Sequence, residues 1–270
     1  MAAGNLSEAE RAWNEKVYKK AEEYLRRITP DEIDLERYFA PDDTDLMTLK
    51  DVYVQFIHSA QNYQRMPKVI AFDKRKNEVR EILDGFNYLT VSEWNPKDLY
   101  QEFRTKFDIQ SEDTKYNSWY KWSCSIVDSA KFLREFSSVE DFRTFVSLFD
   151  YNVHTRMALP LLISEKISGI GFALACDLLK ELGFSKYPKP DVHLIEVFSK
   201  LGLSSEDPLD NFEAIVRMSD ICQEFDETAT PYKVDKIIWL ICSGRYYHEK
   251  PEYKQLGHKD DFIEMMLKEK

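Results

Sequence analysis

Glycine is scarce in this chain, and its cysteines are few and widely separated. Only 8 of the 270 residues are glycine, while periodic apolar stretches alternate with Pro, Asp and Asn residues. We therefore expect an all-α protein. The 4 cysteines have no short mutual spacing, which excludes a compact disulfide framework and indicates a reducing, intracellular setting.

Long hydrophobic runs are also missing. No apolar run reaches the roughly 20 residues that a membrane-spanning helix needs, and no signal peptide is recognisable at the polar N-terminus. The hydrophobic content of 43% and the mean hydropathy of −0.50 are typical of a soluble globular protein. We expect an intracellular protein, in the cytoplasm and nucleoid or in the nucleus, with no membrane partner. A chain of 270 residues is long enough for one or two domains.

An excess of positive charge is the third absence. The formal net charge is −11, whereas nucleic-acid binders usually carry a basic surface that neutralises phosphates. A DNA-binding role would therefore depend on a local groove. The candidate groove residues are Lys68, Lys74, Arg75, Lys76, Lys186, Lys189, Arg245 and Lys250. The alternative is that these are ordinary solvated charges.

What the chain does have is a glycine hairpin between two apolar segments. Gly169 and Gly171 flank Ile170, and glycine permits a tight turn with positive φ and close approach of a ligand. A helix is predicted from about 172 to 182, and one from 159 to 165 with a proline in its first turn. Because the first N–H groups of a helix lack internal partners, they suit a phosphate oxygen. The predicted phosphate contacts are the backbone atoms of Ser168, Gly169, Ile170, Gly171 and Ala173. The alternative is a purely structural turn.

A lone aspartate follows this hairpin. Asp191 lies between a proline and an apolar helix that begins at Val192. The position predicts a helix N-cap. A carboxylate fixed at a helix start is also held rigidly toward any ligand, so the two roles are compatible.

Four segments together resemble the helix-hairpin-helix DNA glycosylases of the endonuclease III superfamily. The hairpin at 167–171 and Asp191-Val192-His193 match that family's hairpin and catalytic aspartate. The Ser59-Ala60-Gln61 triplet is similar to its Ser-Ala-Gln, and residues 239–246 to the segment that leads into its iron–sulfur loop. They occur in the family's order and cover roughly residues 50 to 248.

The resemblance implies a two-lobed helical fold. A six-helix barrel is expected over residues 52–188, with the helix-hairpin-helix at about 159–182. A second helical domain is expected from residues 1–51 and 189–270. The implied partner is double-stranded DNA with a damaged or modified base, bound by a monomer.

Catalysis is implied for Asp191. Cleavage of a glycosidic bond builds positive charge on the sugar, which a carboxylate stabilises while it activates water. Family members that also cut the strand carry a lysine where this chain has Ala173, so we expect a monofunctional glycosylase. One alternative is a bifunctional glycosylase/lyase that uses a displaced lysine, Lys189. Another is a non-catalytic module that only recognises damaged or unusual DNA.

The expected cofactors also follow from the resemblance to this family. The cysteines do not match an iron–sulfur cluster, and His248 stands near the position of the first cluster cysteine. No cofactor is expected to be required. The resemblance implies a monovalent cation, Na⁺ or K⁺, on the carbonyls of Glu165, Ile167 and Ile170.

A glycosylase must rotate its target base out of the duplex. It therefore needs a side chain that fills the vacated space in the stack, called a wedge, and a pocket that holds the base. Gln61 is the candidate wedge that fills the vacated stack, and the alternative is an exposed loop amide. The candidate pocket residues are Tyr53, Phe56, His58, Trp119 and Trp122. Their alternative is core packing, because 14% of the chain is aromatic. The sequence does not identify the base.

Overall fold

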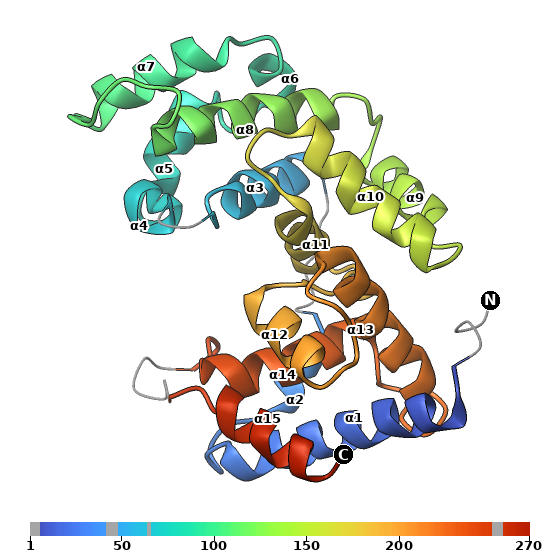
Figure 1. Cartoon of the computed structure of the whole chain (residues 1–270). Helices are drawn as coiled ribbons and strands as arrows, with labels where there is room; N and C mark the ends of the chain where they lie inside the picture. Colours follow the sequence, from blue (N-terminus) through green and yellow to red (C-terminus); the bar gives the residue numbers. More distant parts are fainter. Residues whose placement is uncertain (1–5, 42–47, 64–65, 250–255) are drawn as a thin grey trace. The chain divides into compact units, whose positions relative to one another are not determined.

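The computed structural model describes residues 6–41, 48–63, 66–249 and 256–270, and every regular element in these ranges is a helix (Figure 1). The expected all-α class is therefore confirmed for this part of the chain. Contacts divide the chain into two compact units. We call residues 1–43, 152–157 and 183–270 the terminal unit, and residues 44–151 and 158–182 the central unit.

The terminal unit is organised around one buried helix. Its helices are α1 (Glu8–Ile28), α2 (Glu36–Phe39), α12 (Val192–Lys200), α13 (Pro208–Cys222), α14 (Pro231–Ser243) and α15 (Lys259–Lys268). Helix α14 contacts all five of the others. Its bounds follow from its sequence, because Thr230 caps its first turn, Pro231 tolerates the missing N–H there, and Gly244 ends it with a φ of +60°.

The central unit packs around α8. Its helices are α3 (Leu49–Ala60), α4 (Met66–Ile70), α5 (Phe72–Ile82), α6 (Tyr88–Val91), α7 (Pro96–Lys106), α8 (Ser118–Leu133), α9 (Val139–Leu148) and α11 (Phe172–Glu181), with most of α10 (Val153–Lys166). Helix α8 contacts α3, α4, α6 and α7 (Figure 1). Stacked and edge-on rings of Phe72, Phe103, Trp119 and Trp122 fill the space beside it.

The bounds of the central unit differ from those of the expected barrel domain. The sequence placed a barrel over 52–188, and the central unit runs over 44–151 and 158–182. The identity of this unit as a six-helix barrel stays a prediction.

Two local expectations need correction. The helix before the hairpin begins at Val153, not near 159, so Pro160 lies inside it rather than in its first turn. The apolar neighbours Leu159 and Ile163 are fully buried, and their packing keeps the helix continuous through a residue that would otherwise break it. The sequence also predicts a turn and an N-cap at residues 41–44, before the helix that carries Gln61. Most of these positions fall outside the described residues, and the observed N-cap of this helix, α3, is Thr48. No described helix has both the length and the apolar character needed to span a membrane.

Candidate functional site

The hairpin between α10 and α11 presents backbone at the surface. Ile167 and Ile170 are 0% and 2% exposed and anchor the turn in the central unit. Ser168, Gly169 and Gly171 are exposed between and beside them. The apolar side chains therefore point inward, and the peptide groups that link them are accessible.

The two glycines adopt different conformations. Gly169 has a φ of +82°, and a Cβ there would lie 3.0 Å from Ser125 Oγ. Gly171 has a φ of −84°, and a Cβ would meet nothing within 4 Å. The expected positive φ is thus confirmed at Gly169 and wrong at Gly171, which is in extended backbone as the N-cap residue of α11.

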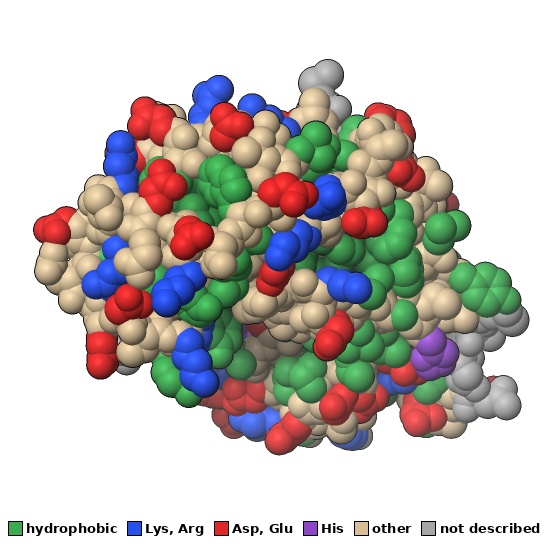
Figure 2. Space-filling view, turned by 90° about the horizontal axis from the view of Figure 1, so that it is seen from above, with side chains coloured by type: hydrophobic (Ala, Val, Ile, Leu, Met, Phe, Trp, Pro, Cys, Tyr) green, Lys and Arg blue, Asp and Glu red, His purple; other side chains and the backbone are tan. Residues whose placement is uncertain are grey.

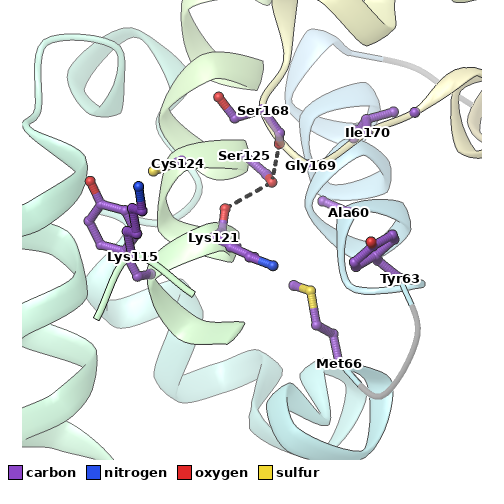
Figure 3. Close-up of a pocket in the computed structure, with 12 residues that line it drawn as sticks. Ala60, Tyr63, Met66, Lys115, Lys121, Cys124, Ser125, Ser168, Gly169 and Ile170 are labelled. Carbon is purple, nitrogen blue, oxygen red and sulfur yellow. Dashed lines mark hydrogen bonds between the residues drawn. The ribbon is translucent and has the colours of Figure 1, made fainter. Parts of the chain in front are cut away.

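Helix α8 holds the hairpin in place. Ser125 Oγ lies 2.5 Å from the carbonyl oxygen of Ser168 and 3.1 Å from that of Lys121 (Figure 3). The N–H of Ser168 donates to Asp128 Oδ2 at 3.1 Å. These contacts fix the turn on both sides of Ser168. At the other end of the turn, no side chain caps α11, so the N–H of Ala173 in its first turn is left for water or a ligand.

A cavity of about 480 Å³ adjoins the hairpin. Residues 168–171 form one wall, and Tyr63, Met66 and Lys121 line the opposite side (Figure 3). Lys115, Tyr120 and Cys124 also line it. The cavity combines aromatic and apolar surface with lysine side chains, all from the central unit.

Asp191 lies in the terminal unit as the N-cap of α12, as the sequence predicts. Its Oδ1 accepts hydrogen bonds from the N–H groups of His193 at 2.9 Å and Leu194 at 3.2 Å. Burial raises the pKa of the Asp191 carboxyl, and the nearby Asp235 carboxylate raises it further, while the Leu194 N–H and the charge of Lys189 lower it. The net shift is upward because a partly buried carboxylate loses hydration and faces a like charge.

Asp235 is a residue that sequence reasoning missed. It lies on α14, is 1% exposed, and its Oδ2 accepts the backbone N–H of Lys189 at 2.7 Å. This bond fixes the segment that leads into Asp191. The available signal was a carboxylate inside a helix rich in apolar residues, since charged groups are seldom buried without a specific partner.

The structure corrects the expected exposure of Gln61. Its side chain is 3% exposed, and Oε1 accepts the N–H of Phe72 at 3.1 Å. The amide joins the end of α3 to the start of α5, so the alternative of an exposed loop amide is wrong, and the wedge role of Gln61 stays a prediction. The exposed aromatic side chain nearby is Tyr63, which is 40% exposed.

Most of the candidate base-pocket aromatics are core residues. Tyr53, Phe56, Trp119 and Trp122 are each no more than 3% exposed. The hydroxyl of Tyr53 donates to the carbonyl oxygen of Ile126, and the indole N–H of Trp122 donates to that of Ile57. Their polar atoms are thus used inside the unit, and the core-packing alternative is the correct one. His58 is partly exposed, with Nε2 3.6 Å from Asp73 Oδ1.

The candidate groove residues are divided between the two units. Lys68, Lys74, Arg75 and Lys76 belong to the central unit, and Lys186, Lys189 and Arg245 to the terminal unit. Lys250 is outside the described residues. Arg75 has a structural role, because it donates to the carbonyl oxygens of Val69 and Ile70 and lies over the Phe107 and Trp119 rings. On the face seen in Figure 2, basic and acidic side chains are interspersed.

The groups that could hold a cation are backbone carbonyl oxygens, not side chains. Among the described residues, no cluster of three or more His, Cys, Asp or Glu side chains has metal-site geometry. The carbonyl oxygen of Ile167 accepts the N–H of Ile170 at 3.2 Å. The Na⁺ or K⁺ site on Glu165, Ile167 and Ile170 stays a prediction.

Comparisons with known proteins identify no relative. No protein-family model matches the chain, and neither a curated protein nor a solved structure matches it.

Proposed function

We propose that this protein is a monofunctional DNA glycosylase of the helix-hairpin-helix type, and that it hydrolyses the N-glycosidic bond of a damaged or modified base. The observation that carries the proposal is the setting of Asp191. Two backbone N–H groups hold one of its oxygens, and burial with a second carboxylate raises its pKa. A rigid carboxylate with a raised pKa is suited to general-base and electrostatic catalysis.

The proposed reaction uses water as the nucleophile. The base leaves with the electron pair of its bond to C1′, which gives an oxocarbenium-like sugar. The ionised Asp191 carboxylate stabilises that charge and accepts a proton from the attacking water, whose oxygen forms the new bond to C1′. The departing base takes up a proton. Terms of this electrostatic kind are typically worth about 10²- to 10³-fold in rate.

The hairpin supports the DNA-binding half of the proposal. Exposed backbone at 168–171 precedes a helix start with no side-chain cap, and such N–H groups favour phosphate oxygens. The proposed substrate is double-stranded DNA bound by a monomer, and the proposed setting is intracellular. A hairpin cation, Na⁺ or K⁺, would order the same turn, and no iron–sulfur cluster or other cofactor is proposed.

The test is release of free bases. Damaged and naturally modified DNAs are incubated with wild type or with Asp191→Asn, and the freed bases are identified by mass spectrometry. Asparagine retains an N-cap acceptor, so the variant should fold. Release of one base by wild type alone supports the proposal. Measurable DNA binding without release of any base would contradict it and favour the non-catalytic recognition module.

The lyase alternative depends on Lys189, whose charge acts on the Asp191 carboxyl. A lyase lysine forms a Schiff base with the sugar, and borohydride reduces this adduct to a permanent bond. The monofunctional reaction predicts no trapped protein–DNA product. A product that forms with wild type and disappears in Lys189→Gln would establish the lyase instead.

A further inference from the structure

We infer that the hairpin cavity binds a single unstacked nucleotide, with its phosphate beside the Lys121 amine and the hairpin backbone and its base against Tyr63 and Tyr120. The inference rests on the proposed DNA-binding role of the hairpin. It adds a binding site whose lining does not include Asp191 and belongs wholly to the central unit.

The size and the walls of the cavity fit this ligand. Its volume of about 480 Å³ falls within the range of small-molecule sites. Tyr63, Tyr120 and Met66 supply aromatic and apolar surface, and an aromatic ring binds any base because every base has a π-face. The ring of Tyr63 is 40% exposed, so it is accessible without unfolding of the core.

The lysine side chains that line the cavity indicate where the phosphate of the nucleotide would bind. Lys121 is partly buried on α8, and its Nζ lies 5.8 Å from the centre of the Tyr63 ring. Figure 3 shows this amine directed between Tyr63 and Met66, into the space that the hairpin faces. Lys115 lines the same space. An aromatic wall beside an amine favours a ligand that has both a flat ring and a negatively charged group. A nucleotide, with its base and its phosphate, has both.

The hairpin wall adds backbone recognition. A side chain at Gly169 would collide with Ser125, and Gly171 has open space beside its Cα. The backbone at Gly171 can therefore approach a phosphate closely. A nucleotide in the cavity would be held by the same turn that the proposed function assigns to the DNA backbone.

The probe for the test is 2-aminopurine, whose fluorescence is quenched by stacking on aromatic rings. It is used as the free deoxynucleoside monophosphate and within a single-stranded tetranucleotide. Saturable quenching by wild type is expected, with Lys121→Gln and Tyr63→Ala each weakening binding about five-fold or more. Lys131→Gln is the matched control, because Lys131 is exposed on the same helix and does not line the cavity.

The two arms distinguish the source of the nucleotide. Equal affinity for the monophosphate and the tetranucleotide supports a site for free nucleotides, and preference for the tetranucleotide supports a site for a DNA strand. The inference is overturned if wild type does not bind either probe, or if Lys121→Gln and Tyr63→Ala bind as wild type does. Thermal unfolding checks that both variants are folded.

The inferred nucleotide site and the proposed glycosylase activity can each fail independently of the other. Asp191→Asn should bind both probes with unchanged affinity, because Asp191 does not line the cavity. Base release by wild type with no probe binding would remove the nucleotide site alone. Probe binding with no base release would remove the enzyme and retain the site.

Discussion

Gly169 and Gly171 have different roles in the hairpin, although the sequence presents them as a pair. Replacing Gly169 with alanine places a Cβ at positive φ and 3.0 Å from Ser125 Oγ. We expect Gly169→Ala to lower the free energy of unfolding by about 1–2 kcal/mol. Gly171→Ala should change it by less than about 0.5 kcal/mol, while the added methyl group weakens DNA binding.

Urea denaturation and fluorescence anisotropy with a labelled duplex measure the two effects. Equal destabilisation by both substitutions would contradict the structural distinction. Unchanged DNA binding by Gly171→Ala would show that the ligand does not approach this backbone.

The Asp191–Asp235 pair predicts a specific pH dependence. Asp191 must be ionised to stabilise positive charge, so base release should fall as the pH drops through its raised pKa. Asp235→Asn removes the like charge but retains an oxygen for the Lys189 N–H. Burial is the larger cause of the raised pKa and Asp235 the second, so the acid limb of the pH–rate profile should move only partway toward the ordinary value.

The acid limb should therefore lie at lower pH in Asp235→Asn than in wild type. A profile that is unchanged or moves to higher pH would contradict the pairing.

The same pair of carboxyl groups also affects the stability of the fold. Because the folded state binds the Asp191 proton more tightly, this group stabilises the fold most at low pH, and that stabilisation is lost as the pH rises from the unfolded pKa through the raised one.

Individual residues show where sequence reasoning succeeded and where it did not. Asp191 was predictable as an N-cap because capping depends on local backbone geometry. Gln61 and the aromatic candidates were not, because their burial depends on which face of α3 and α8 meets the core. Asp235 was missed because its partner, the Lys189 backbone, lies 46 residues away in the chain.

At the scale of elements, a buried lysine joins α1 to the start of α14. Lys233 Nζ lies 2.8 Å from Asp226 Oδ2, 2.9 Å from Thr228 Oγ1 and 3.5 Å from Glu22 Oε2. Burial would raise the pKa of Asp226, yet hydrogen bonds from Lys233, Thr228 and Tyr18 hold it well below its usual range. These contacts tie three segments of the terminal unit together.

We expect Lys233→Met to lower the free energy of unfolding at pH 7 by about 3 kcal/mol, because the Asp226 carboxylate and Glu22 lose their buried partner. Lys268→Met, at an exposed pair with Glu264, should cost no more than about 0.5 kcal/mol. Since the pKa of Asp226 is lowered on folding, its stabilisation is full above its ordinary value and is lost as the pH falls below it.

Denaturant titrations from pH 7 to pH 3 measure this difference. The deficit of Lys233→Met relative to wild type should shrink toward the acid end of the series. A deficit that is constant over this range would mean that the contact with Asp226 contributes little.

Helices were predicted best where both ends carry local signals. The sequence indicated a helix from about 172 to 182 and another that begins at Val192, and the structure has α11 and α12 there. The start of α10 was placed too late because proline at position 160 favours a helix start locally, whereas packing of the buried residues around it decides the outcome.

For the whole molecule, the net charge of −11 opposes DNA binding. Only a few phosphates can then be neutralised, and each contact with duplex DNA contributes about −0.9 to the slope of log K against log salt. We expect a slope of about −2 to −3 and weak binding to undamaged duplex. Fluorescence anisotropy over a salt series measures it. A slope near zero would exclude phosphate recognition, and one near −10 would indicate an extensive basic surface that this account does not contain.

The most direct measurement is the single-turnover rate of base release by Asp191→Asn relative to wild type, at saturating enzyme and on the DNA that wild type acts on. The account predicts a rate about 10²- to 10³-fold lower, with unchanged affinity for that DNA and an unchanged fold. A variant that releases the base at the wild-type rate would contradict the assignment of Asp191 as the catalytic carboxylate.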